Sequence, residues 1–221
     1  MKIKIGNDMN RSKLSGFIIS AILVAICMGT GIACSNPTTD RSILPDSLHI
    51  EEGDVVLRRG TGMTSRAVML ADGGSDYSHC GIVVIVDGKA MVVHAVPDEP
   101  DFEGDVDRVK MEPIRCFYSS IRASKGCVLR CKNRGVARRS ARKATEYYRR
   151  GLLFDHNYDI ADSTELYCSE LVELAYRAGG RDISDGKRHN IRLPGMKLQN
   201  VILPSDFLKS KELYTVSRFR N

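Results

Sequence analysis

The sequence predicts an α+β fold in which helices pack against a small antiparallel sheet. Its patterns run strand, helix, hairpin, strand, helix, helix, strand, with no internal repeat. Strands that follow one another, rather than alternating strictly with helices, favour an antiparallel sheet. The strongest local signal is GIVVIVDGKAMVVHAV, from Gly81, where two β-rich runs flank an Asp-Gly dipeptide typical of a two-residue hairpin turn.

The first elements follow from local composition. GDVVLRR, from Gly53, has the β-rich character of a first strand, and SRAVMLAD, from Ser65, has helical spacing after a serine. After the hairpin of residues 81–96, the run GCVLRCKN at 126–133 predicts another strand. Residues 136–150 alternate apolar and charged groups with the period of an amphipathic helix.

The last third of the chain predicts one long helix, one short helix and a final strand. ADSTELYCSELVELAYRAGG has helical spacing from about Ser163, begins with a motif that resembles a capping box and ends at a glycine pair. LPSDFLKSKEL predicts a short helix capped by Ser205, and YTVSRF a last strand. Residues 96–115 and 181–203 are expected to be loops that form the walls of a groove.

The N-terminus has the features of a targeting segment. Basic residues precede the apolar run FIISAILVAICM, residues 17–28, which is twelve residues long. A spanning helix needs about 20 apolar residues, so this length suits a signal-peptide core. TGIACSN resembles a bacterial lipoprotein cleavage site, which predicts a signal peptide over 1–33, a lipidated Cys34, a tether over 34–50 and a domain over 51–221. Ordinary cleavage nearby and an uncleaved anchor remain alternatives.

The net charge does not point to nucleic acid. The chain carries +6, but residues 1–33 hold four basic groups and one acidic group, so +3 remains for 34–221. The arginine-rich segment 134–150 has helical spacing and reads as a solvated helix face. An export signal with modest charge therefore disfavours a nucleic-acid partner.

The cysteines predict neither a disulfide framework nor a metal site. Cys127 and Cys131 lie four residues apart on a predicted strand, about 13 Å of backbone, which is too far for a disulfide. The sequence contains no CxxC or HxxxH spacing. We therefore expect no zinc or other metal and no cofactor.

The hairpin brings two histidines together. A two-residue turn pairs Val86 with Lys89 and places His94 opposite Gly81. His79 and His94 are then diagonal neighbours on one face, with about 7–8 Å between their backbones, and the glycine leaves room between the rings. Both faces of the hairpin are apolar, so these histidines need hydrogen-bond partners. The hairpin alone is consistent with a structural His–His pair.

Cys168 is a candidate nucleophile. With Leu171, Val172 and Ala175 it falls at the i, i+3, i+4 and i+7 positions of the predicted helix, the stripe that faces the sheet. A cysteine near a helix N-terminus has its thiolate stabilised by the helix dipole, and an adjacent histidine strengthens the effect. Taken alone, Cys168 is better explained as a small buried apolar side chain.

Together these motifs resemble a known family. GDVVLRR, SDYSHCGIVV, VVHAV, LLFDHNYD and LYCSELVELAY are similar to the YiiX/YaeF-type proteins, circularly permuted relatives of the NlpC/P60 cysteine peptidases, over roughly residues 52–208. The resemblance implies a papain-like fold in which Cys168 is the nucleophile, His79 the general base and His94 the third, orienting residue.

The third position departs from many relatives, which carry glutamate in an EA context where this chain has HA. A neutral His94 can still accept a hydrogen bond from His79, but it stabilises a charged imidazolium less well than a carboxylate does. Asp98 and Glu99 lie near in sequence and are candidates to supplement it.

Four further residues have weaker assignments. Tyr77, in the DYSH motif, either lines the site, donates to an oxyanion or is structural. Asp155 either shapes the substrate side or caps a turn. Asp54 is expected to hold the entry turn of the first strand, and Glu170 to lie at the surface or behind the site.

These observations predict an exported thiol hydrolase of the amidase or peptidase class, held at a membrane through Cys34. Its substrate is expected to be a cell-envelope peptide or lipid, cleaved at an amide or acyl bond through Cys168, His79 and His94. The alternatives are a lipid-acyl hydrolase or transferase on the same fold, and a non-catalytic envelope binding module.

Overall fold

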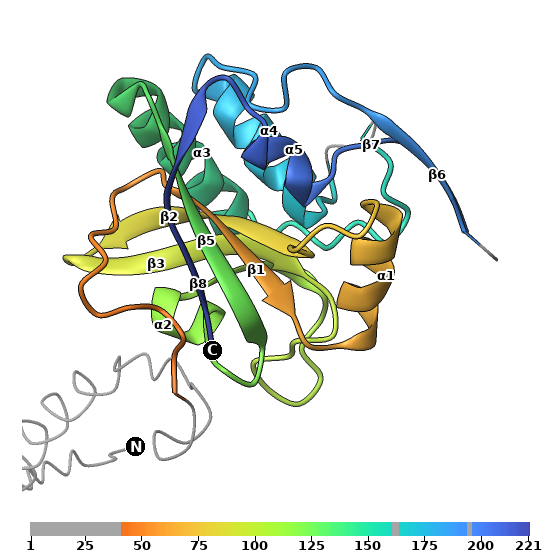
Figure 1. Ribbon diagram of the computed structural model, residues 1–221, viewed down its shortest axis with the longest axis horizontal. Helices are drawn as coiled ribbons and strands as arrows, with labels where there is room; N and C mark the ends of the chain where they lie inside the picture. The colour runs from red at the N-terminus through yellow and green to blue at the C-terminus, as the bar shows by residue number, and fades with distance from the viewer. Residues whose placement is uncertain (1–40, 161–163, 194–195) are drawn as a thin grey trace, which may run out of the picture. The chain divides into compact units, whose positions relative to one another are not determined.

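The computed structural model describes residues 41–160, 164–193 and 196–221 (Figure 1). A six-stranded antiparallel sheet has the order β4-β3-β2-β1-β5-β8, and β6 and β7 form a separate two-stranded hairpin. The strands are β1 Val55–Gly60, β2 His79–Val86, β3 Lys89–Val96, β4 Arg108–Pro113, β5 Ala123–Cys131, β6 His189–Leu193, β7 Met196–Val201 and β8 Leu213–Arg220. The predicted α+β class with an antiparallel sheet is confirmed.

Helices and apolar side chains cover both faces of this sheet. The helices are α1 Met63–Ala71, α2 Ile114–Phe117, α3 Arg134–Arg149, α4 Cys168–Ala178 and α5 Pro204–Leu208. The packed pair α3 and α4 buries one face in the larger core, and α2 contributes to a second core on the other (Figure 1). Two apolar faces in the β2–β3 hairpin required this arrangement, because each needs a cover.

The hairpin register is the predicted one. Val86 pairs with Lys89, and the pairing continues to Ile82 with Val93. Asp87 and Gly88 have φ values of 49° and 74°, the left-handed conformations of a two-residue turn whose twist matches the strands. The two histidines therefore lie on one face, as the sequence predicts.

Two predicted loop regions contain strands. β4 occupies residues 108–113, and β6 and β7 occupy much of 181–203. The sequence RVKMEP of β4 does not show the apolar alternation expected of a strand. Lys110 and Glu112 lie on one face of it and form ion pairs where a strand usually places apolar groups. The expectation of structureless walls was wrong at both places.

The helix that carries Cys168 begins later than predicted. α4 starts at Cys168, with Tyr167 as N-cap and no side-chain cap, rather than near Ser163. The residues before it are extended, and Leu166 donates its N–H to the Leu153 carbonyl at 3.0 Å. The capping-box motif is therefore not used as a cap, because this backbone pairs with another segment.

The short helix α5 also has a different cap. Leu203 is the N-cap residue, and its N–H donates to the Asp206 carboxylate at 2.9 Å. Ser205 instead donates its backbone N–H to Asp72, at 3.1 Å. A carboxylate within the first turn satisfies the helix end in place of the predicted serine.

Residues 41–50, part of the predicted tether, pack on the domain. Ile43 donates its N–H to the Tyr118 carbonyl at 2.9 Å, and Leu44 is buried in the second core. Apolar side chains in this segment bury against the sheet, so it belongs to the folded unit.

The predicted signal peptide, Cys34 and the first part of the tether lie outside the described residues. Within the described residues, no helix combines the length and apolar character needed to cross a membrane.

Candidate active site

Cys168 is the first residue of α4, at the end that carries the positive pole of the helix dipole. The helix is anchored by Leu171, Val172 and Ala175, all fully buried in the larger core. The N-cap residue Tyr167 makes no side-chain hydrogen bond to the first turn. The partly exposed thiol is thus held by a rigid element at the wall of a cavity.

His79 is the first residue of β2 and lies against Cys168. The imidazole is 6% exposed and has the Phe117 ring 5.7 Å away, centroid to centroid. Burial lowers the pKa of His79 to about 4, although its hydrogen bond with Cys168 acts in the opposite direction. The ring is therefore neutral near pH 7 and can accept a proton.

The surroundings of Cys168 favour its thiolate. A hydrogen bond from Cys80 is the largest influence; burial opposes it, and His79 and Ser169 add to it, so the pKa of Cys168 falls below its usual range. Burial raises the pKa of Cys80, which keeps that thiol protonated as a donor. The Ser169 Oγ lies 3.8 Å from the Cys168 Sγ and 3.6 Å from the Cys80 Sγ.

His94 stands directly behind His79. The distance between His79 Nε2 and His94 Nδ1 is 2.9 Å, and the ring centroids are 5.1 Å apart in an edge-to-face arrangement. His94 is 1% exposed, and a Cβ on Gly81 would approach its Cβ to 3.1 Å. The space that the sequence assigned to this glycine is therefore used by the histidine pair.

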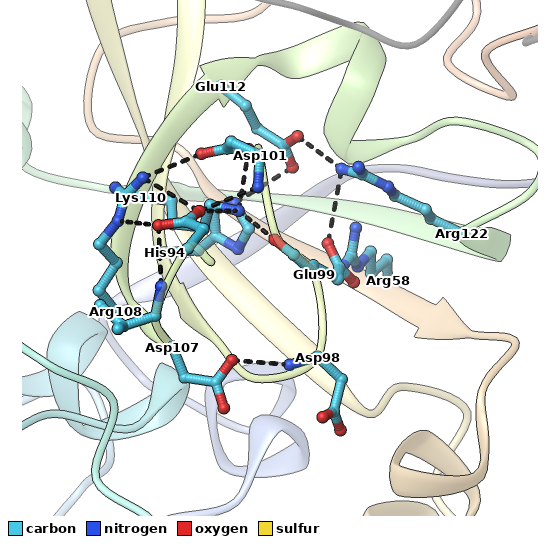
Figure 2. A network of polar contacts seen from close by, with 12 residues as sticks. Arg58, His94, Asp98, Glu99, Asp101, Asp107, Arg108, Lys110, Glu112 and Arg122 are labelled. Carbon is cyan, nitrogen blue, oxygen red and sulfur yellow. Dashed lines mark hydrogen bonds and ion pairs between the residues drawn. The ribbon is translucent and has the colours of Figure 1, made fainter. Parts of the chain in front are cut away.

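Glu112 on β4 completes the row, and the sequence interpretation missed it. Its Oε1 lies 3.1 Å from His94 Nε2, and its Oε2 accepts from Arg122 at 2.8 Å (Figure 2). Burial would raise the pKa of Glu112, but the hydrogen bond from His94 and nearby cations lower it to about 2. The signal that could have revealed it is the Lys-Met-Glu alternation of the unrecognised strand.

The two acids proposed to supplement His94 do not contact it. Glu99 forms an ion pair with Arg58, and its second oxygen lies 3.5 Å from Arg122 (Figure 2). Asp98 donates its backbone N–H to the Asp107 carboxylate at 3.0 Å. Chain proximity suggested these residues, but the loop directs them to other partners.

Tyr77 is brought into the core rather than to the cavity. It is 4% exposed in the larger core and close to Cys127, and burial above all raises its pKa to about 12. The cavity lining does not include it. Its position fits the structural alternative considered for the DYSH motif.

Asp155 caps a turn beside the cavity. Its carboxylate accepts the backbone N–H groups of Asn157, Tyr158 and Asp159 at 2.7, 2.9 and 2.6 Å. Phe154 and Tyr158, on either side of this turn, line the cavity. Asp155 therefore caps a turn, and that turn forms part of the cavity wall.

The remaining two acidic residues lie elsewhere. Asp54 accepts from the Arg130 guanidinium through both oxygens at 2.8 Å and from the Glu51 N–H at 2.8 Å, which places it at the entry of β1. Glu170, expected at the surface or behind the site, is 1% exposed in the first turn of α4.

A cavity of about 300 Å³ opens beside Cys168 and His79. Charged groups line one side of it: Arg58, Asp98, Glu99 and Arg122. The other walls come from α1, the β6–β7 hairpin, the start of α5 and the turn at Asp155. Most of the side chains on these walls are apolar or aromatic: Ala67, Val68, Ala71, Phe154, Tyr158, Ile191, Leu198, Val201, Ile202, Leu203 and Pro204. The cavity suits an apolar part of a substrate.

No cluster of three or more histidine, cysteine, aspartate or glutamate side chains with metal-binding geometry occurs in 41–160, 164–193 and 196–221.

A thiol at the start of a sheet-packed helix, beside an imidazole from the sheet, is the arrangement of papain-like cysteine hydrolases. Residues 49–217 match the family model described as permuted papain-like amidase enzyme, YaeF/YiiX, C92 family. The chain belongs to this family, and it is therefore an enzyme of a cysteine hydrolase class.

A solved structure has the same fold. It is the protein titled metalloprotein yiiX from Escherichia coli O157:H7, with a TM-score of 0.60 and 23% sequence identity. The match covers 76% of this chain and 96% of that one. A search of curated proteins found no match.

Proposed function

We propose that the protein is a thiol hydrolase that cleaves an amide or acyl bond of a cell-envelope substrate through Cys168, His79 and His94. The observation that carries this proposal is the contact of Cys168 with a neutral, buried His79 at the wall of an apolar cavity. A purely structural cysteine would not need a depressed pKa or access to a cavity.

The chemistry follows from this contact. The His79 imidazole takes the thiol proton as the Cys168 sulfur attacks the substrate carbonyl, and the C–S bond forms. In this proposal the N-terminal end of α4, whose N-cap Tyr167 makes no side-chain cap, stabilises the oxyanion. His79 then returns the proton to the leaving amine or alcohol, and water hydrolyses the thioester with His79 again as base.

The cavity indicates what the substrate carries. Its apolar walls favour an aliphatic or aromatic group next to the scissile carbonyl. An amide fits the family's amidase class, and the same apolar walls support lipid-acyl hydrolysis or transfer as the second candidate.

The place of action is proposed from the N-terminal sequence. We propose export, lipidation at Cys34 and residence at the membrane of the cell envelope, with a peptide or lipid substrate and no nucleic-acid partner. A lipoprotein's acyl chains together give stable attachment. Cys34→Ala should move the protein out of the membrane fraction; retention of the variant there would contradict the anchor.

Trapping of the acyl-enzyme tests the activity. The purified protein is mixed with two panels of amides and esters, one with apolar and one with charged acyl groups, and its intact mass is recorded. We expect acyl adducts on Cys168 from the apolar panel, removed by mild hydroxylamine as a thioester should be, and no adduct in Cys168→Ala. An unmodified wild-type protein with both panels would favour the binding module.

A further inference from the structure

We propose that Glu112 is a positioning residue that sets the proton arrangement of the histidine pair and supplies the carboxylate missing at His94. Acting through His94, it holds His79 in the tautomer that leaves one nitrogen free for the Cys168 proton. This inference rests on the proposed function for its catalytic meaning, while the tautomers themselves are independent of it.

The sheet register places the three side chains in one row. His94 on β3 pairs with Lys110 on β4, so Glu112, two residues further, is a diagonal neighbour on the same face. The row runs from His79 Nε2 to His94 Nδ1 at 2.9 Å, and His94 Nε2 then lies 3.1 Å from Glu112 Oε1, a close contact whose angle departs from that of a straight hydrogen bond. Neighbouring strands thus fix each spacing.

The row allows only one arrangement of protons when both rings are neutral. A bare lone pair on His94 Nε2 would be repelled by a carboxylate oxygen 3.1 Å away, so His94 carries its proton on Nε2, where it faces Glu112. His94 Nδ1 is then an acceptor, and His79 must donate to it from Nε2. His79 Nδ1 is left with a lone pair, which is the nitrogen needed to accept the Cys168 proton.

The same row can stabilise the positive charge that forms on His79 during the reaction. When His79 takes the proton it becomes an imidazolium, next to a His94 side chain that is 1% exposed. A neutral His94 offers this charge little compensation. The Glu112 carboxylate, which follows His94 in the row, provides a full negative charge in a poorly solvated place.

Other charged groups surround Glu112, but none of them takes its place beside His94. Arg122 occupies its second oxygen at 2.8 Å, and Arg58 lies near enough to influence it electrostatically (Figure 2). Glu99 bonds to both arginines. Lys110, the direct partner of His94 in the register, is turned to Asp101 at 2.9 Å.

Glu112→Gln is the sharpest variant because it keeps the shape of the side chain. Arg122 only donates, so it should draw the single carbonyl oxygen of the glutamine and leave the amide N–H₂ facing His94. His94 Nε2 must then accept, which moves its proton to Nδ1. His79 Nε2 would then accept a hydrogen bond from His94 Nδ1–H, so the proton of His79 would lie on Nδ1 and that nitrogen could not act as the base for Cys168.

Glu99→Gln is the matched control. It removes a carboxylate from the same arginines, Arg58 and Arg122, but Glu99 has no contact with His94. Both variants lose one negative charge in the same network, and only one of them changes the row.

Nitrogen-15 NMR of the histidine rings in the full-length protein reports the tautomers without any substrate. We expect protons on Nε2 of both rings in the wild type and in Glu99→Gln, and on Nδ1 in Glu112→Gln. The wild-type spectrum alone overturns the proposal if His94 carries its proton on Nδ1, so the result does not depend on whether a variant folds.

Turnover on a substrate found by acyl-enzyme trapping is the second readout. Glu112→Gln should lower kcat by about 10²- to 10⁴-fold with KM within about twofold, as expected for a wrong tautomer. Glu99→Gln, which removes a carboxylate at the cavity wall without changing the row, should lower kcat at least about tenfold less than Glu112→Gln does. Equal losses in both variants would overturn the proposal. Absence of turnover in the wild type counts against the hydrolase, while the NMR result still decides the role of Glu112.

Discussion

At the scale of single residues, the site combines a thiol, two imidazoles and one carboxylate in a single line. His79 and His94 were predicted to be neighbours from the hairpin register, and they lie 2.9 Å apart between ring nitrogens. Glu112 was not predicted, because its partner His94 lies on another strand whose register with β4 is invisible in the sequence. Through this row Glu112 lies 3.1 Å from His94, which is the contact on which the positioning role proposed for Glu112 depends.

Replacement of His94 by glutamate tests this role. His94→Glu alone would put a second carboxylate close to Glu112, and like charges in a buried place repel. We expect His94→Glu to lower kcat, and His94→Glu combined with Glu112→Gln to recover at least about tenfold of the loss, because the glutamine can donate to the new carboxylate. Steady-state kinetics on the same substrate measure this.

His94→Leu, with and without Glu112→Gln, is the control for the His94→Glu experiment. It removes the acceptor of His79 altogether, so Glu112→Gln should give no recovery in its background. Recovery of similar size in both backgrounds would show that Glu112 acts through stability rather than through the row.

At the scale of elements, the sequence identified the strands whose side chains are apolar on a regular period. β1, the β2–β3 hairpin, β5 and β8 were all expected close to their observed places. β4, β6 and β7 were missed because their alternating positions carry charged or polar groups. The start of α4 was misplaced by about one turn, since Glu165, at the end of the motif that resembles a cap, pairs as extended backbone with Leu153.

Gly81 in β2 lies directly against His94, so its lack of a side chain matters to both the strand and the site. A Cβ there would lie 2.6 Å from Val92 Cγ1, 2.9 Å from the Val93 carbonyl oxygen and 3.1 Å from His94 Cβ. Backbone cannot yield as a flexible side chain does, so Gly81→Ala should destabilise the fold by about 1–3 kcal/mol and displace His94.

Urea unfolding and kcat measure the two effects of Gly81→Ala. The control is Gly88→Ala at the hairpin turn, where nothing lies within 4 Å but φ is +74°, so it strains the turn without touching the site. A Gly81→Ala protein with unchanged stability and kcat would contradict the close approach.

At the scale of the whole molecule, the site joins the two cores. Cys168 is carried by α4 on the larger core, whereas the rings of His79 and His94 contact Phe117 of the second core at 5.7 and 5.3 Å between centroids. The geometry of the pair therefore depends on both sides of the sheet. Sequence patterns could place each residue on its element but not this junction, which arises from packing.

The depressed pKa of His79 makes the fold sensitive to acid. Its folded pKa of about 4 lies below the unfolded value of about 6.5, so the unfolded chain binds the proton more readily between these values. Stability is fully present above about pH 6.5 and is lost as pH falls towards 4, by on the order of 3 kcal/mol. Glu112, with a pKa of about 2, adds a further loss below its unfolded value near 4.5.

Urea unfolding at pH 7, 5.5 and 4.5 measures this loss. In His79→Gln the decline over this range should be clearly smaller, because the titrating group is gone. Identical declines in the two proteins would mean that His79 titrates normally in the folded state.

The central claim, that Cys168 is a nucleophile activated by its contact with His79, is tested most directly by the pH dependence of its alkylation. The full-length protein is treated with iodoacetamide between pH 5 and 10, and the labelling rate of Cys168 is read by peptide mass spectrometry, with buried Cys127 as internal reference. We predict that Cys168 labels with an apparent pKa clearly below 8, and that His79→Ala raises this value. Labelling only above pH 9, or an unchanged profile in His79→Ala, would contradict the account.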